Sequence, residues 1–376
     1  MRALWLVMDS VGCGGAPDAA DFGDAGADTL GHLFEFEGLE LPNLASLGLY
    51  EIMREHSRIV PEAVLLRAGA AACRLTERSI GKDTTTGHWE LAGVVLEQPF
   101  LTFERFPEEL ITELEMRVGV SFVGNCVASG TEILEKLGEE HCRSGCPILY
   151  TSADSVMQIA AHEESFGLAR LLQVCEVARK LLDERGLRVG RVIARPFVGD
   201  VQEGFRRTPN RRDYSLMPPP TVLDRLQIQG VMVVGIGKIS DIFAARGISE
   251  NYPTKSNAEG MAMIERLWQN PCTQDQLIVV NLVDFDMLYG HRRDPKGYAQ
   301  ALREFDAWLG RWLPQVAEGE FVCITADHGN DPYHPGTDHT REQVPLLTLH
   351  SPLPLHQSGD FTQVAELLER FFLQNE

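Results

Sequence analysis

Residues 321–342 read FVCITADHGNDPYHPGTDHTRE, and this stretch decides how the rest of the chain is interpreted. It begins with the apolar run 321–324, which is bounded by turn residues and is typical of a buried strand. Asp327 and His328 follow the run, and a loop rich in glycine and proline leads to a second Asp-His pair. Open parallel sheets carry their chemistry at the carboxyl ends of strands, so this strand is expected to deliver part of a metal site.

An ordinary role must be weighed against metal binding for each of these side chains. A single histidine near a strand end is usually a hydrogen-bonded surface or core residue. This loop, however, concentrates histidine and aspartate in few residues, and both suit divalent cations. The candidates within it are His328, His334, His339, Asp327, Asp331 and Asp338. Their density favours metal binding, and the remaining ligands must come from elsewhere in the chain.

Three other segments also consist of an apolar run followed by polar residues. They are 4–8, which precedes Asp9 and a glycine-rich turn, 231–234, and 277–283. Continuous apolar residues imply burial on both faces, which is typical of a parallel sheet covered by helices. Helical spacing of apolar residues follows at 258–269 and 298–313. The alternation predicts an α/β fold with a mainly parallel sheet and right-handed crossovers.

The middle of the chain has a different organisation, with helical stretches and short strand-like pieces between about 101 and 216. The helical stretches are 108–118 and 166–184, and the strand-like pieces are 147–150 and 191–194. The proline run at 217–220 resembles a linker. Candidate ligands lie both before and after this region. We therefore expect a discontinuous catalytic core, residues 1–100 and 217–376, with a smaller α/β domain inserted at 101–216.

Composition is that of an ordinary soluble globular protein, with 376 residues, 44% hydrophobic and 23% charged. No apolar run reaches membrane-spanning length, so no membrane partner is expected. The apolar start of the chain runs into Asp9 and is too short for a signal peptide, so a cytoplasmic location is expected. The eight cysteines are scattered without a Cys-x-x-Cys pair, and reduced thiols are expected.

The formal net charge of −20 argues against a nucleic-acid partner, because phosphate backbones require a basic face. A small anionic substrate would instead need a local basic cluster. Arginines provide such a cluster at positions 191, 195, 206, 207, 211 and 212. Any one of them could be an ordinary solvated residue, but arginine binds phosphate through a planar fork of donors.

The acids and imidazoles at the expected strand ends together form a set of mixed oxygen and nitrogen ligands. They are Asp9, Asp286, His291, Asp327, His328 and His339. Asp9 alone could form a turn, and Asp286 alone could cap a helix. As a set, they suit two divalent ions, which can clamp both oxygens in a displacement at phosphorus.

Residues 81–90, GKDTTTGHWE, offer a nucleophile for such a centre. The threonine hydroxyls could simply cap the helix that is expected to begin near Trp89. The same position at a helix N-terminus also favours developing negative charge, and a metal ion can activate an alcohol nucleophile. Spacing alone does not choose among the three threonines.

Several motifs together resemble the bacterial phosphopentomutase family of the alkaline phosphatase superfamily, from end to end of the chain. They are Asp9-Ser10, the 81–90 segment, DFDMLYGHRRD at 284–294, and Asp327-His328 with GTDHTRE at 336–342. The resemblance implies an alkaline-phosphatase-like α/β core, with a mainly parallel sheet covered by helices and an inserted substrate-binding cap domain.

The resemblance also implies roles for individual residues. Thr84 matches the residue that carries the phosphoryl group. Of the two manganese ions expected per subunit, one matches the ligands Asp9, Asp327 and His328, and the other matches Asp286, His291 and His339. The choice of Asp286 over Asp284 rests on the resemblance. Substrate contacts are expected from Ser152, Asp154, Arg191, Ile193 and Arg207, with Lys238 a weaker candidate.

The implied activity is that of an isomerase interconverting ribose 1-phosphate, and 2-deoxyribose 1-phosphate, with the 5-phosphate. It proceeds through a phosphothreonine and a bisphosphate intermediate, with a bisphosphate sugar as activator and a monomeric enzyme expected. Three alternatives stay open. A phosphatase or phosphodiesterase would keep the six ligands without needing the arginines, and a cofactor-independent phosphoglycerate mutase would use serine at the position of Thr84. A non-catalytic metal-binding module is the third.

Overall fold

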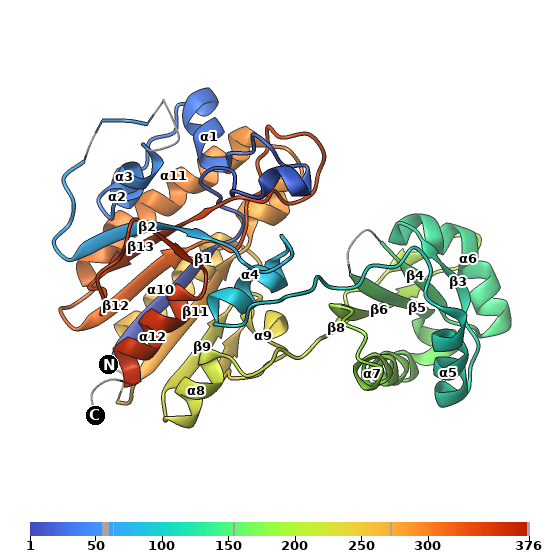
Figure 1. Ribbon diagram of the computed structural model, residues 1–376. Helices are drawn as coiled ribbons and strands as arrows, with labels where there is room; N and C mark the ends of the chain where they lie inside the picture. The colour runs from blue at the N-terminus through green and yellow to red at the C-terminus, as the bar shows by residue number, and fades with distance from the viewer. Residues whose placement is uncertain (55–59, 63, 153–154, 271–272, 374–376) are drawn as a thin grey trace. The chain divides into compact units, whose positions relative to one another are not determined.

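The computed structural model describes residues 1–376 apart from 55–59, 63, 153–154, 271–272 and 374–376. The chain divides into two compact units (Figure 1). The first unit comprises Met1–Gln98 together with Pro218–Glu376, and the second comprises Pro99–Met217. Each unit has its own sheet, so each is described by itself.

An eight-stranded sheet forms the centre of the first unit, in the order β10-β9-β11-β1-β12-β13-β2-β14. Only β13 runs against the others, because it pairs antiparallel with both β12 and β2 while every other pairing is parallel. The sheet is therefore mainly parallel, as predicted. The strands are β1 (Arg2–Met8), β2 (Ala70–Thr76), β9 (Met232–Ile236), β10 (Glu250–Tyr252), β11 (Gln276–Leu282), β12 (Glu320–Thr325), β13 (Val344–Leu349) and β14 (Ser358–Asp360).

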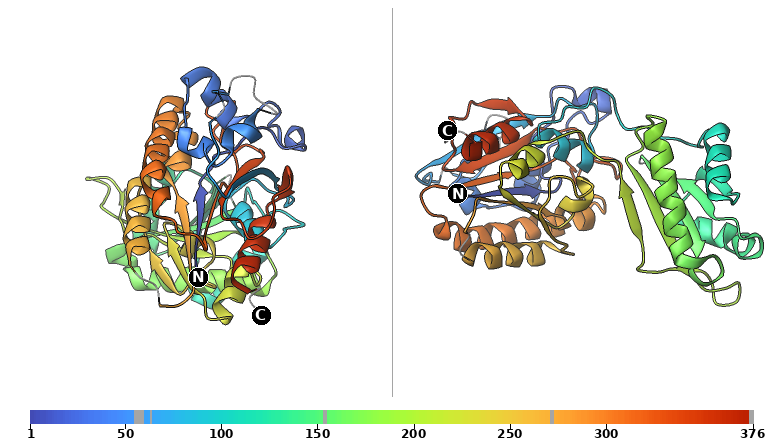
Figure 2. Two further views of the ribbon diagram at one scale, coloured as in Figure 1. Left: turned by 90° about the vertical axis from the view of Figure 1, so that its left-hand side faces the viewer. Right: turned by 90° about the horizontal axis from the view of Figure 1, so that it is seen from below.

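Helices cover both faces of this sheet, with α10 and α11 on one side and α8 and α12 on the other (Figure 2). Their coverage explains why β11 is buried along its whole length and β1 along all but its first residue. The α-helices are α1 (Thr29–Glu37), α2 (Pro42–Ala45), α3 (Leu49–Met53), α4 (Thr84–Leu91), α8 (Val222–Ile228), α9 (Ile239–Ile242), α10 (Asn257–Gln269), α11 (Pro295–Trp312) and α12 (Gln363–Leu373). Shorter helical turns are η1 (Ala19–Phe22), η3 (Phe285–Gly290) and η4 (Leu313–Gln315).

The second unit contains a six-stranded sheet in the order β3-β4-β5-β6-β7, with β8 also paired to β6. Its strands are β3 (Val123–Val127), β4 (Ile148–Thr151), β5 (Val156–His162), β6 (Arg191–Val198), β7 (Arg206–Arg207) and β8 (Arg212–Ser215). Its helices are α5 (Glu108–Val118), α6 (Gly130–Ser144), the turn η2 (Glu163–Gly167) and α7 (Leu168–Glu184).

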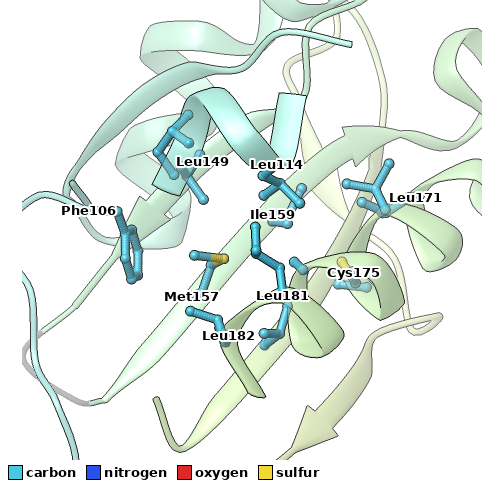
Figure 3. Close-up of a cluster of buried hydrophobic side chains, with 14 of the residues drawn as sticks. Phe106, Leu114, Leu149, Met157, Ile159, Leu171, Cys175, Leu181 and Leu182 are labelled. Atoms are coloured by element: carbon cyan, nitrogen blue, oxygen red, sulfur yellow. The ribbon is translucent and has the colours of Figure 1, made fainter. Parts of the chain in front are cut away.

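Alternating side chains of this second sheet enter two separate hydrophobic clusters. Met157 and Ile159 of β5 join a cluster with residues of α5 and α7, including Leu114 and Leu181 (Figure 3). Ala160, the residue after Ile159, enters a second cluster with residues of α6. Because successive side chains of a strand point to opposite faces, the two clusters lie on opposite faces of the sheet.

Sequence periodicity located four of the eight strands in the sheet of the first unit. The expected strands at 4–8, 231–234, 277–283 and 321–324 are confirmed as β1, β9, β11 and β12. The edge strands β10 and β14 and the neighbouring strand β2 were not predicted, because short or mixed runs carry little periodic signal. Helix α6 was also missed, since its apolar stripe is narrow and interrupted by charged residues.

None of the seven described cysteines forms a disulfide, in agreement with the expected free thiols. Among the residues that the structure describes, no helix combines the length and apolar character needed to cross a bilayer.

Candidate metal centre and nucleophile

Three neighbouring strands of the first unit deliver the candidate ligands to one edge of the sheet. Asp9 follows β1 directly, and Asp327 lies two residues beyond β12. Asp286 lies in η3, four residues after the end of β11. Because β11, β1 and β12 are adjacent and parallel, their carboxyl ends meet at the same edge.

The six predicted ligands form two groups, in each of which the candidate ligand atoms lie within 4.8 Å of one another. One group contains Asp9, Asp327 and His328, and the other contains Asp286, His291 and His339. The groups adjoin, since the rings of His328 and His339 stack with their centroids 3.9 Å apart. The structure therefore brings together all six residues in the division that the resemblance implied.

In the first group, the Nε2 atom of His328 lies 3.5 Å from Asp9 Oδ1 and 3.4 Å from Asp327 Oδ2. In the second group, Asp286 lies between two imidazoles. Its Oδ2 is 3.2 Å from His291 Nε2, and its Oδ1 is 3.4 Å from His339 Nε2. Both groups thus converge imidazole nitrogens on carboxylate oxygens.

Backbone carbonyls orient all three imidazoles in the same way. The Nδ1 atoms donate to Gly329 O at 3.0 Å for His328, to Thr337 O at 2.8 Å for His291, and to Lys82 O at 3.0 Å for His339. A carbonyl oxygen can only accept, so each Nδ1 carries a proton, and the neutral form of each ring offers Nε2 as a ligand atom.

Burial makes the first group electrostatically demanding. Asp9 and Asp327 are completely buried, and neither Asp9 Oδ1 nor Asp327 Oδ2 forms a hydrogen bond with the described residues. Burial, together with the charge of Asp327, raises the pKa of Asp9 to about 7. Buried carboxylate oxygens that accept no hydrogen bond are costly, and a divalent cation would compensate them. The donor set and its unpaired oxygens therefore fit a metal ion.

The second group has the same character. Burial by itself lowers the pKa of His339, but the hydrogen bond and charge of Asp286 outweigh burial and raise this pKa to about 9. The strong pull of Asp286 on the ring shows how much negative potential this group concentrates. A cation held by the same atoms would take the place of that proton.

The threonine segment lies at the start of α4, and the structure separates its hydroxyls. Asp83, not a threonine, caps the helix by accepting from the backbone N–H groups of Thr85 and Thr86. The hydroxyl of Thr86 donates to the Asp83 carboxylate. The Thr84 hydroxyl instead lies 3.2 Å from His328 Nε2, beside the first ligand group.

Asp284 is likewise separated from Asp286. It forms a reciprocal pair with Asn257, accepting from the Asn257 N–H at 2.8 Å and donating its own N–H to the Asn257 side chain at 2.9 Å. Asp284 therefore fastens η3 to the start of α10, whereas Asp286 belongs to the second ligand group.

Several residues that contact the ligands were missed by sequence reasoning. Asn281 donates to Asp9 Oδ2 at 3.1 Å, and Asn330 donates to Asp286 Oδ1 at 2.7 Å. The backbone N–H of Ser10 donates to Asp327 Oδ1 at 3.1 Å. Asn281 carried a signal, because it is the one polar residue inside the apolar run 277–283. Asn330 and Ser10 carried none beyond their nearness to ligands.

Arg293 ties together the two loops that hold the second group. Its guanidinium donates to the carbonyls of Gly290 and Asp331 at 3.0 Å each, and to Asp338 O at 3.0 Å. The carbonyl of Gly336 and the side chain of Asn330 also accept from it. The loop between His328 and His339 is thereby fastened to the one that carries His291.

The predicted substrate-binding residues fall in both units. Lys238 belongs to the first, where its Nζ lies 3.7 Å from Asp9 Oδ2. In the second unit, Ser152 is half-buried at the end of β4, while Asp154 lies outside the described residues. Substrate binding by these residues stays a prediction.

The remaining substrate candidates lie on β6 and β7. Arg191 is half-exposed, with Nη1 3.6 Å from Asp213 Oδ2, and Ile193 is buried on the same strand. Arg207 is exposed and donates to the Tyr150 hydroxyl at 3.4 Å. Burial, followed by the charge of the nearby Arg211, lowers the pKa of Arg195, so arginines do gather on this sheet.

Comparison with known proteins places this chain in a family. Residues 1–375 match the metalloenzyme superfamily. The phosphopentomutase of Symbiobacterium thermophilum is 52% identical over 355 residues, which cover 94% of this chain and 88% of the relative. The phosphopentomutase of Caldanaerobacter subterraneus is 51% identical over 354 residues, covering 93% and 88%.

A solved structure adds support for the fold alone. The PH0037 protein from Pyrococcus horikoshii is 13% identical, with a TM-score of 0.50 over 100% of this chain and 98% of that one. The expected class, an alkaline-phosphatase-like α/β core, is confirmed by the superfamily match and the mainly parallel sheet. On the sequence relationships, the chain belongs to the phosphopentomutase family, a family of isomerases within the metalloenzyme superfamily.

Proposed function

We propose that the protein interconverts ribose 1-phosphate and ribose 5-phosphate, and the corresponding 2-deoxyribose phosphates, through a phosphorylated Thr84. The observation that carries this proposal is the position of the Thr84 hydroxyl, 3.2 Å from His328 Nε2 at the first residue of α4. A hydroxyl there combines a helix N-terminus with a cluster of metal-ligand side chains, and both favour a phosphoryl group.

Two manganese ions are the proposed cofactors. Asp9, Asp327 and His328 would hold one, and the group of Asp286, His291 and His339 would hold the other. When bound, the ions would supply positive charge that stabilises the transferring phosphoryl group and the threonine alkoxide. Backbone carbonyls keep the three imidazoles oriented for that role.

The proposed reaction consists of two phosphoryl transfers. In the first, the bond between phosphorus and Thr84 Oγ1 breaks while a bond forms to the free hydroxyl of the entering pentose monophosphate. The proton of that hydroxyl ends on Thr84, and the sugar becomes a bisphosphate. After the sugar turns over, its other phosphoryl group returns to Thr84 and leaves the isomeric monophosphate. A bisphosphate sugar added from outside would prime the enzyme by the same return step.

The second unit is proposed to bind the sugar phosphate and to exclude water, which would otherwise hydrolyse the phosphothreonine. Its arginines support this role, because Arg191 and Arg207 keep part of their surface exposed. Ser152, Asp154 and Ile193 are proposed to join them, with Lys238 of the first unit. A monomeric cytoplasmic enzyme acting on free pentose phosphates is the proposed setting.

The test follows ribose 5-phosphate formation from ribose 1-phosphate with manganese, while free phosphate is measured in the same samples. Isomer formation well ahead of phosphate release is expected. Release of phosphate at a comparable rate would replace the mutase by the phosphatase that the sequence left open.

The nucleophile is tested separately with labelled bisphosphate. Thr84→Ala is expected to abolish the acid-stable label on the protein and to lower turnover by about 1,000-fold or more. Thr85→Ala is the matched control, because it removes a hydroxyl from the same helical turn and should keep the label. Label retained in Thr84→Ala would contradict the assignment.

A further inference from the structure

One face of α4 rests directly on the end of β12. Thr84, Gly87 and His88 are spaced i, i+3 and i+4, which places them on the same side of the helix. A methyl group on Gly87 would lie only 2.0 Å from the carbonyl oxygen of Asp327. The helix backbone therefore contacts the peptide that carries two ligands of the first group, with no side chain between them.

His88, on the same face of α4, forms further contacts through both nitrogens of its ring. It is completely buried, and its Nδ1–H donates to the carbonyl of Thr84 at 2.8 Å. The same nitrogen lies 3.1 Å from Asp327 Oδ2. On the other side, Nε2 lies 3.5 Å from the amide of Asn281, which itself donates to Asp9 Oδ2.

We propose that His88 is a positioning residue for the transfer at Thr84, holding the turn that carries the hydroxyl in fixed register with the Asp327 and Asp9 carboxylates. This inference rests on the proposed function. A single imidazole contacts the backbone of the nucleophile and one carboxylate, and reaches a second through Asn281. A shift of the helix by a fraction of an ångström would break one of these contacts, and transfer reactions are sensitive to displacements of that size.

An ordinary structural histidine would also be buried and hydrogen-bonded, so the test must separate positioning from stability. His88→Leu removes the Nδ1 donor, and His88→Gln places its amide nearer the Nε2 position. His88→Asn returns an N–H donor at the Nδ1 position. Trp89→Phe is the structural control, since it removes a buried hydrogen bond from the next residue of the same helix, to Ile242 O at 3.0 Å.

For His88→Leu we expect kcat to fall about 100-fold while KM changes by less than about 3-fold. His88→Asn should recover at least about 10-fold of that loss, and His88→Gln should not. Trp89→Phe should lower the melting temperature without lowering kcat. If His88→Leu fails to fold, kcat is compared between His88→Asn and His88→Gln, and this comparison alone tests the proposal. Equal kcat in these two variants, or a His88→Leu loss no larger than that of Trp89→Phe, overturns the proposal.

A second measurement does not depend on turnover. Manganese binding, counted by electron paramagnetic resonance, is expected to weaken about 10-fold or more in His88→Leu and to stay unchanged in Trp89→Phe. If the wild-type protein converted no pentose phosphate, the proposed function would fail, while this comparison would still show whether His88 positions the carboxylates. Unchanged manganese affinity in His88→Leu would show that it does not.

Discussion

The ligand edge of the first unit and the arginine-bearing strands of the second arrange their charges in opposite ways. Asp9 and Asp327 are completely buried, and the imidazoles beside them are oriented by backbone carbonyls. Arg191 and Arg207, in contrast, reach solvent. The guanidinium of Arg191 lies 3.6 Å from the carboxylate of Asp213, which accepts two hydrogen bonds from Arg211 at 2.6 Å.

This difference shows two ways of preparing a charged site. Burial with backbone hydrogen bonds holds side chains in place before anything binds, at a large electrostatic cost that a cation can offset. Exposed arginines cost little to maintain and can be ordered by an anion when it arrives. Substitutions at the ligand edge should therefore reduce activity more than substitutions on the arginine strands.

The largest effect is expected from Asp286→Asn, with Asp284→Asn as its matched control. Asp286 faces both His291 and His339. Loss of its charge should therefore release one of the two bound manganese ions and lower activity by about 100-fold or more. Asp284 is occupied with Asn257, and its variant should keep both ions. Metal content per subunit, measured on both variants, checks this. Equal metal loss in the two would show that the groups are assigned wrongly.

A smaller effect on activity is expected from Arg207→Ala. Loss of a charge-assisted hydrogen bond to phosphate costs about 1.5–3 kcal/mol, which is about a 10- to 100-fold decrease in kcat/KM. Manganese binding should not change, because the substitution lies in the other unit. Arg206→Ala, the neighbouring residue on β7, is the control and should behave like the wild type. Weakened manganese binding in Arg207→Ala would contradict the separation of the metal-binding groups of the first unit from the arginines of the second.

Two glycines test the rigidity of the two regions. Gly87→Ala should destabilise the protein by about 1–3 kcal/mol, because the new methyl group meets the backbone of Asp327, which cannot move aside. In Gly138→Ala of α6, the atoms nearest to the new methyl group belong to the ring of Phe205, a side chain that can shift. Its strain should be roughly balanced by the gain in helix propensity, about 1 kcal/mol. Urea unfolding of both variants checks the contrast, and equal destabilisation would refute it.

The smallest effect concerns acid stability of the second unit. His141 is buried, donates from Nδ1 to Cys146 O at 2.7 Å, and accepts at Nε2 from the backbone of His162 at 2.9 Å. Burial lowers the pKa of His141 in the folded state. Its contribution to stability is therefore complete above the unfolded pKa, about 6.5, and is lost as the pH falls through the lower folded value.

Amide hydrogen exchange in α6 and β5 should consequently become faster as the pH falls from about 6.5 to 5. The measured rates are first corrected for the pH dependence of intrinsic amide exchange. The imidazoles of the ligand groups do not belong to these elements, so the comparison stays within the second unit. In His141→Gln, protection should be lower at neutral pH but should depend less on pH. An unchanged pH dependence in that variant would assign the acid sensitivity to other groups.

Much of the first unit could be predicted because its strands are buried on both faces. A fully buried parallel strand must be a continuous apolar run, and a polar residue at its end stands out at once. Apolar runs of this kind predicted β1, β11 and β12, and the polar residues after them included Asp9, Asp286 and Asp327. Strand β13, the one antiparallel strand of the sheet, has the same apolar character, so its direction could not be read from its composition.

Contacts between distant parts of the chain could not be predicted in this way. Thr84 and His328 are 244 positions apart, and Asn281 and Asp9 are 272 apart. No periodicity links such residues, so the choice among the threonines had to rest on the resemblance. The role of Asp83 as the cap of α4 was hidden for a different reason, because the threonines that follow it are also residues that commonly cap helices.

The sequence by itself determined the chemistry available to this protein: apolar runs long enough for a buried parallel sheet, and carboxylate and imidazole groups at their ends. These properties are local, since burial and ligand type depend on residues that are neighbours in the chain. Only the tertiary structure decided which hydroxyl faces His328, which aspartate joins the second ligand group, and how His88 bridges Thr84 and Asp327. The physical reason is that these contacts depend on sub-ångström packing of α4 against the end of β12, which no local pattern encodes.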